Sequence, residues 1–177
     1  EEKSVNELVS SVLTSHGRVD TLVFCAGIID FGHLSAVDPE MWDRVMGVNL
    51  RGAFLTVRAV LPAMRQQEKG NIVLVSAIGA FGGGGVAPIY RASKAALNMV
   101  LKSAAIEYAR RLPQVKLVAF HPGTTDTGLS KPFQRGVAPG SLFTPAFVAG
   151  KLAALLDQAV PDAELSYLAW DGSSIEW

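Results

Sequence analysis

Apolar positions along the chain follow two patterns, a helical spacing and short continuous runs. Val5, Leu8, Val9 and Val12 predict a helix over residues 4–16 that ends at Gly17. Continuous apolar runs are typical of strands that are covered on both faces of a parallel sheet. Such strands are predicted at residues 21–26, 72–76, 115–120 and 165–169, and further helices at 39–66, 88–111 and 145–158. Strands that alternate with helices predict one α/β domain over residues 1–177, with a parallel sheet.

The long segment 39–66 carries signals at its start, middle and end. Asp38 before Pro39 is an N-cap followed by proline at the first helical position. Pro62 is expected to break or bend this helix. Asn49 falls on the same inner face as Val45, where a buried amide needs hydrogen-bond partners. It either staples or kinks the helix, or links the interior to a functional site.

Three polar side chains surround the glycine run at 82–85. Ser76 ends a predicted strand, and Tyr90 and Lys94 are one helical turn apart on one face of the helix 88–111. A lysine ammonium beside a phenol favours the phenolate, so we expect Lys94 to lower the pKa of Tyr90. Ser76 would hydrogen-bond a substrate oxygen beside that phenol. This pattern predicts an acid/base site for a carbonyl/alcohol pair, and the glycine run is either a mobile wall of the site or a tolerant loop.

Two other strand ends carry candidate groups. Cys25 is interpreted either as a small buried hydrophobe or as a reactive thiol. The turn His121-Pro122-Gly123 leads into Thr124, Thr125, Asp126 and Thr127, which form either a capped turn or a ligand-binding set at a strand's carboxyl end. No second ligand stands at metal-binding spacing from His121, so no metal is expected. The segment Leu129–Leu142 is expected to be irregular and to shape a substrate pocket.

Composition and charge limit the kinds of partner and the cellular compartment that the sequence predicts. The formal net charge is zero and no basic cluster is present, so nucleic acid is not an expected partner. One cysteine suits a reducing compartment. No apolar run reaches membrane-spanning length, and the polar start is unlike a signal peptide, so we expect a cytoplasmic protein without membrane contact. The apolar content of 49% indicates buried subunit surface.

Together these motifs resemble the short-chain dehydrogenase/reductase family over the whole chain. Cys25-Ala26-Gly27 is similar to its Asn-Ala-Gly motif, and Pro122-Gly123 with Thr127 is similar to its Pro-Gly-x-x-x-Thr motif. The stretch LSKPFQ and the ending AWDGSSIEW further resemble the C-factor-like branch. The residues that match the family's catalytic tetrad, in order and context, are Asn49, Ser76, Tyr90 and Lys94.

The resemblance implies a Rossmann-type doubly wound parallel sheet and an NAD(P)-dependent oxidoreductase. It implies that Tyr90 exchanges a proton with the substrate oxygen, that Ser76 polarises this oxygen, and that Asn49 holds a water linked to Lys94. Lys94 would also bind the nicotinamide ribose hydroxyls. The implied cofactor, NAD or NADP, would contact Cys25, Ala26, Gly27, Tyr90, Lys94, Pro122, Gly123, Thr125 and Thr127. The implied partners are a small carbonyl or alcohol and a second copy of the chain, paired through helices 39–66 and 88–111 into a homodimer or homotetramer.

The chain departs from the family at its start. It begins near the family's third helix, so the fold is expected to be N-terminally incomplete and to lack the glycine-rich turn that binds the pyrophosphate. The strand at 21–26 would then form an open edge and would also lose the helices that cover one of its sides. The alternative reading is a catalytically inactive relative that acts as an interaction or regulatory protein.

Overall fold

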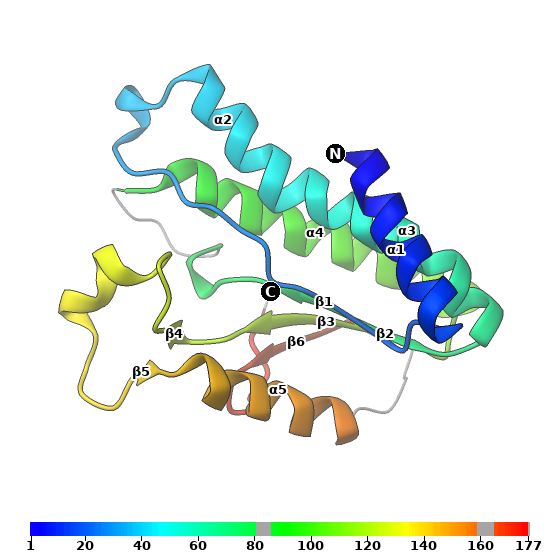
Figure 1. The fold of residues 1–177 in the computed structure, drawn as a ribbon. Helices are drawn as coiled ribbons and strands as arrows, with labels where there is room; N and C mark the ends of the chain where they lie inside the picture. The colour runs from blue at the N-terminus through cyan, green and yellow to red at the C-terminus, as the bar shows by residue number, and fades with distance from the viewer. Residues whose placement is uncertain (81–85, 159–164, 177) are drawn as a thin grey trace.

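The computed structural model describes residues 1–80, 86–158 and 165–176, and its centre is a parallel β-sheet (Figure 1). All three neighbouring strand pairs are parallel, which confirms the predicted fold class. The first strand ends at Phe24, earlier than the predicted Ala26. The strand order is β1-β2-β3-β6, with β1 at Thr21–Phe24, β2 at Gly70–Val75, β3 at Val115–His121 and β6 at Leu165–Ala169.

Helices cover both faces of the sheet and make three layers (Figure 1). Leu97 of α4 packs in one core cluster with Leu74 of β2, and Val148 of α5 packs in another with Val73 of β2. Successive residues of β2 therefore face opposite helix layers, as in any strand buried on both sides. Helices α1 (Glu2–His16), α3 (Gly52–Gln67) and α4 (Pro88–Arg111) lie on one face, and α5 (Pro145–Gln158) lies on the other.

Local capping signals set the helix boundaries. Gly17 adopts a left-handed conformation with φ of 73°, and its N–H donates to the carbonyl of Leu13, which ends α1 as predicted. The Asp38 carboxylate accepts a hydrogen bond from the N–H of Met41 at 2.6 Å and begins α2 (Pro39–Met46). The predicted helix from Pro88 to Arg111 is also confirmed.

Of the break or bend expected at Pro62, the break is wrong, and the bend stays a prediction. Helix α2, a π turn called η2 (Gly47–Arg51) and α3 follow one another without a gap, and Pro62 lies inside α3. Proline removes one backbone donor, but Val60 and Met64 on either side are buried and hold this part of α3 on the core. The irregularity of the long helix is the π turn, which contains Asn49.

Strand β1 is an edge of the described sheet. It pairs with β2 alone within the described part of the chain, as expected for an open edge, and Val23 is 39% exposed. The apolar run alone predicts cover on both faces, which is wrong, whereas the expectation that this strand lacks helices on one side is confirmed. The core cluster under α5 contains Val73 of β2 and Val118 of β3 but no residue of β1.

The turn after β3 needs a glycine. Gly123 has φ of 70°, and a Cβ placed on it would lie 2.7 Å from the ring of Phe143. The following segment 129–142 is more regular than predicted, since it contains a 3-10 helix, η4 (Lys131–Gly136). Phe133 of η4 stacks on Phe31, with ring centroids 5.7 Å apart. The short strands β4 (Thr124–Thr125) and β5 (Leu142–Phe143) pair beside it.

Short 3-10 turns complete the described elements, η1 at Leu34–Ala36 and η3 at Ile78–Ala80. The glycine run at 82–85 lies outside the described residues. Within the ranges that the structure covers, no helix combines the length and apolar character needed to span a bilayer.

Candidate active site at the carboxyl end of the sheet

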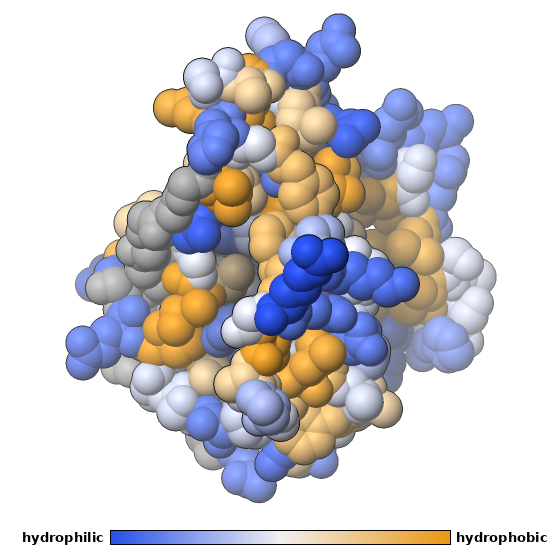
Figure 2. Space-filling model, turned by 90° about the vertical axis from the view of Figure 1, so that its left-hand side faces the viewer, coloured by the Kyte–Doolittle hydropathy of each residue, from blue (hydrophilic) through white to orange (hydrophobic). Residues whose placement is uncertain are grey.

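The side chains of the predicted tetrad gather where β1 and β2 end. A Cβ placed on Gly27 would lie 3.6 Å from Asn49 Oδ1 and 3.8 Å from Lys94 Nζ. Lys94 Nζ donates a 2.7 Å hydrogen bond to the carbonyl of Val75, the last residue of β2. The carboxyl end of a parallel sheet is where open α/β folds bind ligands. Figure 2 views the molecule from this side and shows several apolar patches interspersed with hydrophilic surface.

Asn49 joins the segment after β1 to the helix that carries Tyr90. It is fully buried, and its Oδ1 accepts from the N–H of Ile28 at 2.8 Å. Its Nδ2 donates to the Ile28 carbonyl at 2.9 Å and to Ser93 Oγ at 3.0 Å. Ser93 Oγ in turn donates to the Tyr90 carbonyl at 2.7 Å. The π turn brings a polar side chain into the interior, and such turns recur at functional sites.

Tyr90 and Lys94 lie on one face of α4, as their spacing predicts. Lys94 Nζ is 5.7 Å from the centroid of the Tyr90 ring, and Lys94 is only 4% exposed. Burial lowers the pKa of Lys94 from its ordinary value of 10.5 to about 8, and nearby Cys25 opposes this shift. An amine held this way changes charge near physiological pH, as functional lysines often do.

The expected lowering of the pKa of Tyr90 is wrong. Burial raises this pKa above the ordinary value of 10, and the neighbouring Tyr167 phenol raises it further. Lys94 directs its hydrogen bond to the Val75 carbonyl. Desolvation of the phenolate therefore decides the direction, and the phenol of Tyr90 stays protonated at neutral pH.

Ser76 follows β2 directly and is buried beside α4. Its N–H donates to the Phe120 carbonyl at 2.8 Å, which continues the pairing of β2 with β3. Its Oγ donates to Asn98 Oδ1 at 2.6 Å. Asn98 is one helical turn after Lys94, on the same face of α4. Sequence reasoning missed Asn98, although the i+4 spacing was a signal for it.

A second missed residue, Asp30, caps α4 from a distant segment. Asp30 is 1% exposed, and its carboxylate accepts from the N–H of Tyr90 at 2.9 Å and from that of Ile89 at 3.4 Å. Ala87, at the start of α4, offers no capping side chain. A carboxylate at this end also interacts favourably with the helix dipole. Asp30 thereby anchors the turn from which Tyr90 projects, and only the three-dimensional fold reveals this.

The Cys25-Ala26-Gly27 motif follows β1 and is partly exposed to solvent. Cys25 and Ala26 are exposed, so the interpretation of Cys25 as a buried hydrophobe is wrong. Partial burial nevertheless raises the pKa of the Cys25 thiol, while the charge of Lys94 opposes the rise. This direction disfavours the thiolate that a nucleophilic cysteine needs.

The Pro-Gly-x-x-x-Thr segment lies in the turn after β3. Pro122 and Gly123 are half-buried, and Thr125 Oγ1 lies 3.5 Å from the Pro122 carbonyl that it donates to. Ser130 Oγ caps the turn, since it accepts from the N–H of Thr127 at 3.2 Å and donates to the Thr125 carbonyl at 2.6 Å. The capped turn is thus confirmed, and cofactor contacts by these residues stay a prediction.

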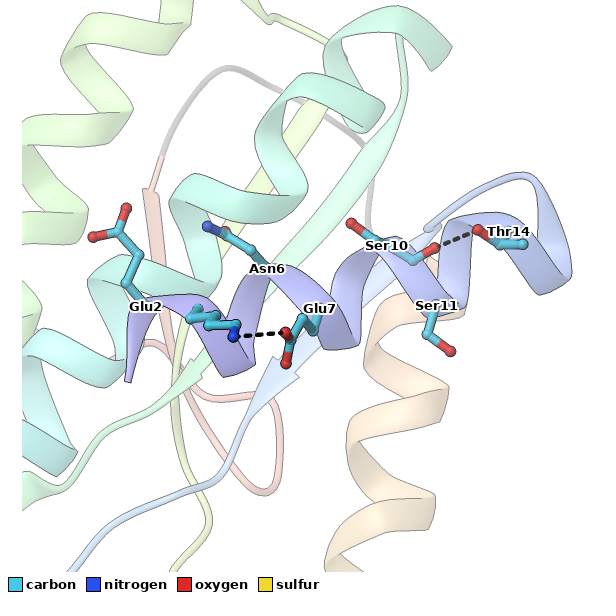
Figure 3. Close-up of a pocket in the computed structure, with 7 residues that line it drawn as sticks. Glu2, Asn6, Glu7, Ser10, Ser11 and Thr14 are labelled. Atoms are coloured by element: carbon cyan, nitrogen blue, oxygen red, sulfur yellow. Dashed lines mark hydrogen bonds and ion pairs between the residues drawn. The ribbon is translucent and has the colours of Figure 1, made fainter.

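Helix α1 has a pocket that is separate from the candidate active site. A shallow pocket runs along the outer face of α1, where Lys3 and Glu7 form an ion pair at 3.8 Å and Thr14 donates to the Ser10 carbonyl (Figure 3). None of the predicted site residues lines this pocket. In the described ranges, no group of three or more histidine, cysteine, aspartate or glutamate side chains is placed to hold a metal ion.

Comparison with known proteins gives consistent results. The family model described as short chain dehydrogenase matches residues 1–138. The chain is 35% identical over 123 residues to a cyclopentanol dehydrogenase of Comamonas, covering 70% of this chain and 48% of that protein. It is 38% identical over 128 residues to a 3-oxoacyl-[acyl-carrier-protein] reductase of Thermotoga maritima, covering 72% and 51%. The chain thus spans about half the length of these curated relatives.

Among solved structures, the NADPH-bound carbonyl reductase from chicken fatty liver has the same fold. Its TM-score is 0.84 at 22% identity, and the superposition covers 100% of this chain and 74% of the other.

Proposed function

The chain belongs to the short-chain dehydrogenase family, and on this premise we propose that it is an NAD(P)-dependent oxidoreductase that interconverts a carbonyl and an alcohol. One observation carries the proposal. Lys94, an almost fully buried amine, shares a helix face with Tyr90 at the carboxyl end of the sheet. The burial of a lysine costs stability, and side chains held at such a cost concentrate at functional sites. Because Lys94 is buried at a cost in stability, we favour an enzyme over a catalytically inactive interaction protein.

The residues present fit the ribose and nicotinamide part of the cofactor. The exposed strand end at Cys25-Ala26-Gly27 leaves backbone open beside Lys94 Nζ, because even a Cβ on Gly27 would approach that amine only to 3.8 Å. The Lys94 amine, 5.7 Å from the centroid of the Tyr90 ring, and the phenol hydroxyl of Tyr90 offer donors to neighbouring hydroxyls. In this proposal Lys94 and Tyr90 bind the ribose hydroxyls, and Pro122, Gly123, Thr125 and Thr127 line the nicotinamide side. NADPH-bound relatives such as the chicken carbonyl reductase support NADP or NAD as the cofactor.

The chain itself supplies position and proton transfer. The nicotinamide, when bound, supplies or accepts the hydride. Tyr90, whose phenol stays protonated at neutral pH, donates its proton to the carbonyl oxygen in the direction of reduction. Ser76 hydrogen-bonds the same oxygen. Asn49 holds the π turn, the segment after β1 and the Tyr90 helix in one arrangement through its bonds to Ile28 and Ser93.

Cofactor binding tests the proposal. We expect the complete gene product that contains this sequence to bind NADPH or NADH saturably, measured by nicotinamide fluorescence. Lys94→Met is expected to weaken this binding about tenfold, because the hydrogen bonds of the amine to the ribose are lost. Lys102→Met, which changes an exposed lysine of the same helix, is the matched control and should bind as the wild type does. A folded wild-type protein that binds neither nucleotide would refute the proposal.

Subunit pairing through α2, α3 and α4 is the second part of the proposal. Large apolar side chains are exposed along these helices, and the fractions are 46% at Trp42, 49% at Phe54, 41% at Val100 and 75% at Ile106. A shallow pocket between η2, α3 and α4 includes Phe54 and Val100. Exposed apolar surface of this kind marks an interaction site.

Sedimentation of the complete gene product measures this pairing. We expect a dimer or tetramer, and Val100→Glu should shift it toward the monomer because it places a charge in the interface. Leu8→Glu, on the exposed side of α1, is the control and should leave the assembly unchanged. A monomeric wild-type protein at micromolar concentration would exclude this interface.

A further inference from the structure

Helix α4 begins at a residue that cannot cap it. A typical N-cap residue has an extended backbone, as Asp38 before α2 does with φ of −94° and ψ of 160°, and its carboxylate accepts from the N–H of Met41. Ala87 at the start of α4 has φ of 58° and ψ of 50° instead, and it has no side-chain acceptor. A left-handed conformation is also costly for a residue other than glycine. The first turn of α4 therefore depends on contacts from elsewhere in the chain.

The segment between β1 and α2 passes the start of α4 and supplies these contacts (Figure 1). The carbonyl of Gly32 accepts from the N–H of Ala87 at 3.3 Å. The carboxylate of Asp30 accepts from the N–H of Tyr90 at 2.9 Å and from the N–H of Ile89 at 3.4 Å. These two N–H groups are the ones that the side chain of an N-cap residue normally serves. Asp30 thus supplies the missing cap of α4 from 60 positions away in the sequence.

A buried carboxylate is a costly cap. Asp30 is 1% exposed, and over the ranges that the structure covers it takes part in no ion pair. Burial of a charge without a counter-ion reduces stability, and a neutral serine or asparagine would also offer an acceptor to these N–H groups. Hydrogen bonds to a carboxylate are stronger than those to a neutral acceptor. The cost is explained if the place of this first turn matters for function.

The first and second turns of α4 are held by different contacts. Lys94, in the second turn, donates to the carbonyl of Val75, which holds this turn on the end of β2. The shorter bond of Asp30 comes from the N–H of Tyr90 itself, and this nitrogen is only two covalent bonds from the Cβ atom of the Tyr90 side chain. Loss of Asp30 would therefore loosen the turn that carries Tyr90 and leave Lys94 in place.

We propose that Asp30 is a positioning residue, which holds the Tyr90 phenol in the place that proton transfer requires. This inference rests on the proposed carbonyl/alcohol chemistry. The segment that carries Asp30 also carries Gly27, which lies beside Lys94 Nζ on the side where the proposed function places the cofactor. Asp30 ties this segment to the first turn of α4, so it fixes the proton donor relative to the cofactor side of the site. It acts through the backbone of Tyr90 and touches neither substrate nor cofactor.

Steady-state kinetics of the complete gene product tests the proposal. Asp30→Ala should lower kcat for carbonyl reduction at least about tenfold, because a displacement of about 1 Å at a reacting group costs up to about a hundredfold. The affinity for NADPH should change little, because Lys94 keeps its own contact with β2. In a Tyr90→Phe background, Asp30→Ala should have no further effect on kcat, because Asp30 acts through Tyr90. A merely structural role would lower kcat by the same factor in both backgrounds.

Asp38→Ala is the matched control, since it removes the carboxylate that caps α2 and should reduce stability without a change in kcat. Asp30→Asn keeps one acceptor oxygen and should lower kcat only about threefold. Amide hydrogen exchange gives a readout that does not depend on turnover. Asp30→Ala should accelerate the exchange of the Tyr90 N–H and leave that of Leu97, farther along α4, unchanged.

Wild-type kcat in a folded Asp30→Ala protein would overturn the inference, and so would an equal loss of kcat in the Tyr90→Phe background. Unchanged exchange of the Tyr90 N–H would overturn it as well, because Asp30 would then not hold the first turn. Thermal unfolding checks each variant, and if Asp30→Ala does not fold, the same outcomes are decided with Asp30→Asn. A wild-type protein without turnover would instead overturn the proposed function and, with it, this inference.

Discussion

Tyr90→Phe is expected to lower turnover by about 10²–10⁴-fold while NADPH binding stays close to that of the wild type. Phenylalanine keeps the ring that fills the half-buried position at the start of α4. It removes the only atom of this residue that can give a proton to the carbonyl oxygen, and general acid catalysis contributes a rate factor of about this size. The ribose loses one hydrogen bond, so the effect on binding is small.

The measurement is the steady-state oxidation of NADPH with a panel of small ketones and aldehydes, beside a fluorescence titration of the same sample. Tyr108→Phe carries the same chemical change on the same helix and should retain full turnover. If Tyr90→Phe kept wild-type kcat while remaining folded, another group would have to donate the proton, and the assignment of Tyr90 would fail.

Lys94→Met is expected to remove a large pH dependence of stability. The pKa of Lys94 is lowered to about 8 in the folded chain, whereas an unfolded chain has the ordinary value of 10.5. Between these values the unfolded state binds more protons, so rising pH favours the folded state. The wild type should therefore gain stability from pH 8 toward pH 10.5, relative to Lys94→Met. One pKa unit corresponds to about 1.4 kcal/mol, so the total gain is roughly 3 kcal/mol.

Urea unfolding of both proteins at pH 7, 8, 9 and 10 measures this difference. Tyr90 and Tyr167 also have raised pKa values, which reduce stability at high pH, but they are common to both proteins and cancel in the comparison. The charge of Lys94 opposes the rise of the Cys25 pKa, so both proteins are compared in a Cys25→Ser background. Lys102→Met removes an exposed charge and should follow the wild type. Parallel curves for the wild type and Lys94→Met would show that Lys94 is not buried as a neutralisable amine.

Local signals in the sequence predicted the elements well. Asp38 with Pro39 identified the start of a helix, and Pro88 to Arg111 was predicted as it is found. These features depend on neighbours within one turn, such as the bond from Met41 to the Asp38 carboxylate. Pro62 shows the limit of this reasoning, because tertiary packing of Val60 and Met64 outweighs the local preference for a break.

Long-range contacts at the site could not be predicted in the same way. Asp30 caps α4 across 60 positions of sequence, and no pattern near Tyr90 indicates it. The raised pKa of Tyr90 depends on burial and on Tyr167 from another strand, whereas the sequence shows only the nearby lysine. The spacing of Tyr90 and Lys94 gives their shared face, and the desolvation of that face follows from the assembled fold.

Transfer of a labelled hydride tests the central claim most directly. The complete gene product would be incubated with NADPH that carries deuterium at C4 of the nicotinamide, on the transferred face, and with a carbonyl substrate that it consumes. The account predicts an alcohol with one deuterium on the carbinol carbon, formed by the wild type and at most about 1% as fast by Tyr90→Phe. A folded protein that binds NADPH but gives no deuterated alcohol from any carbonyl in the panel would contradict the account.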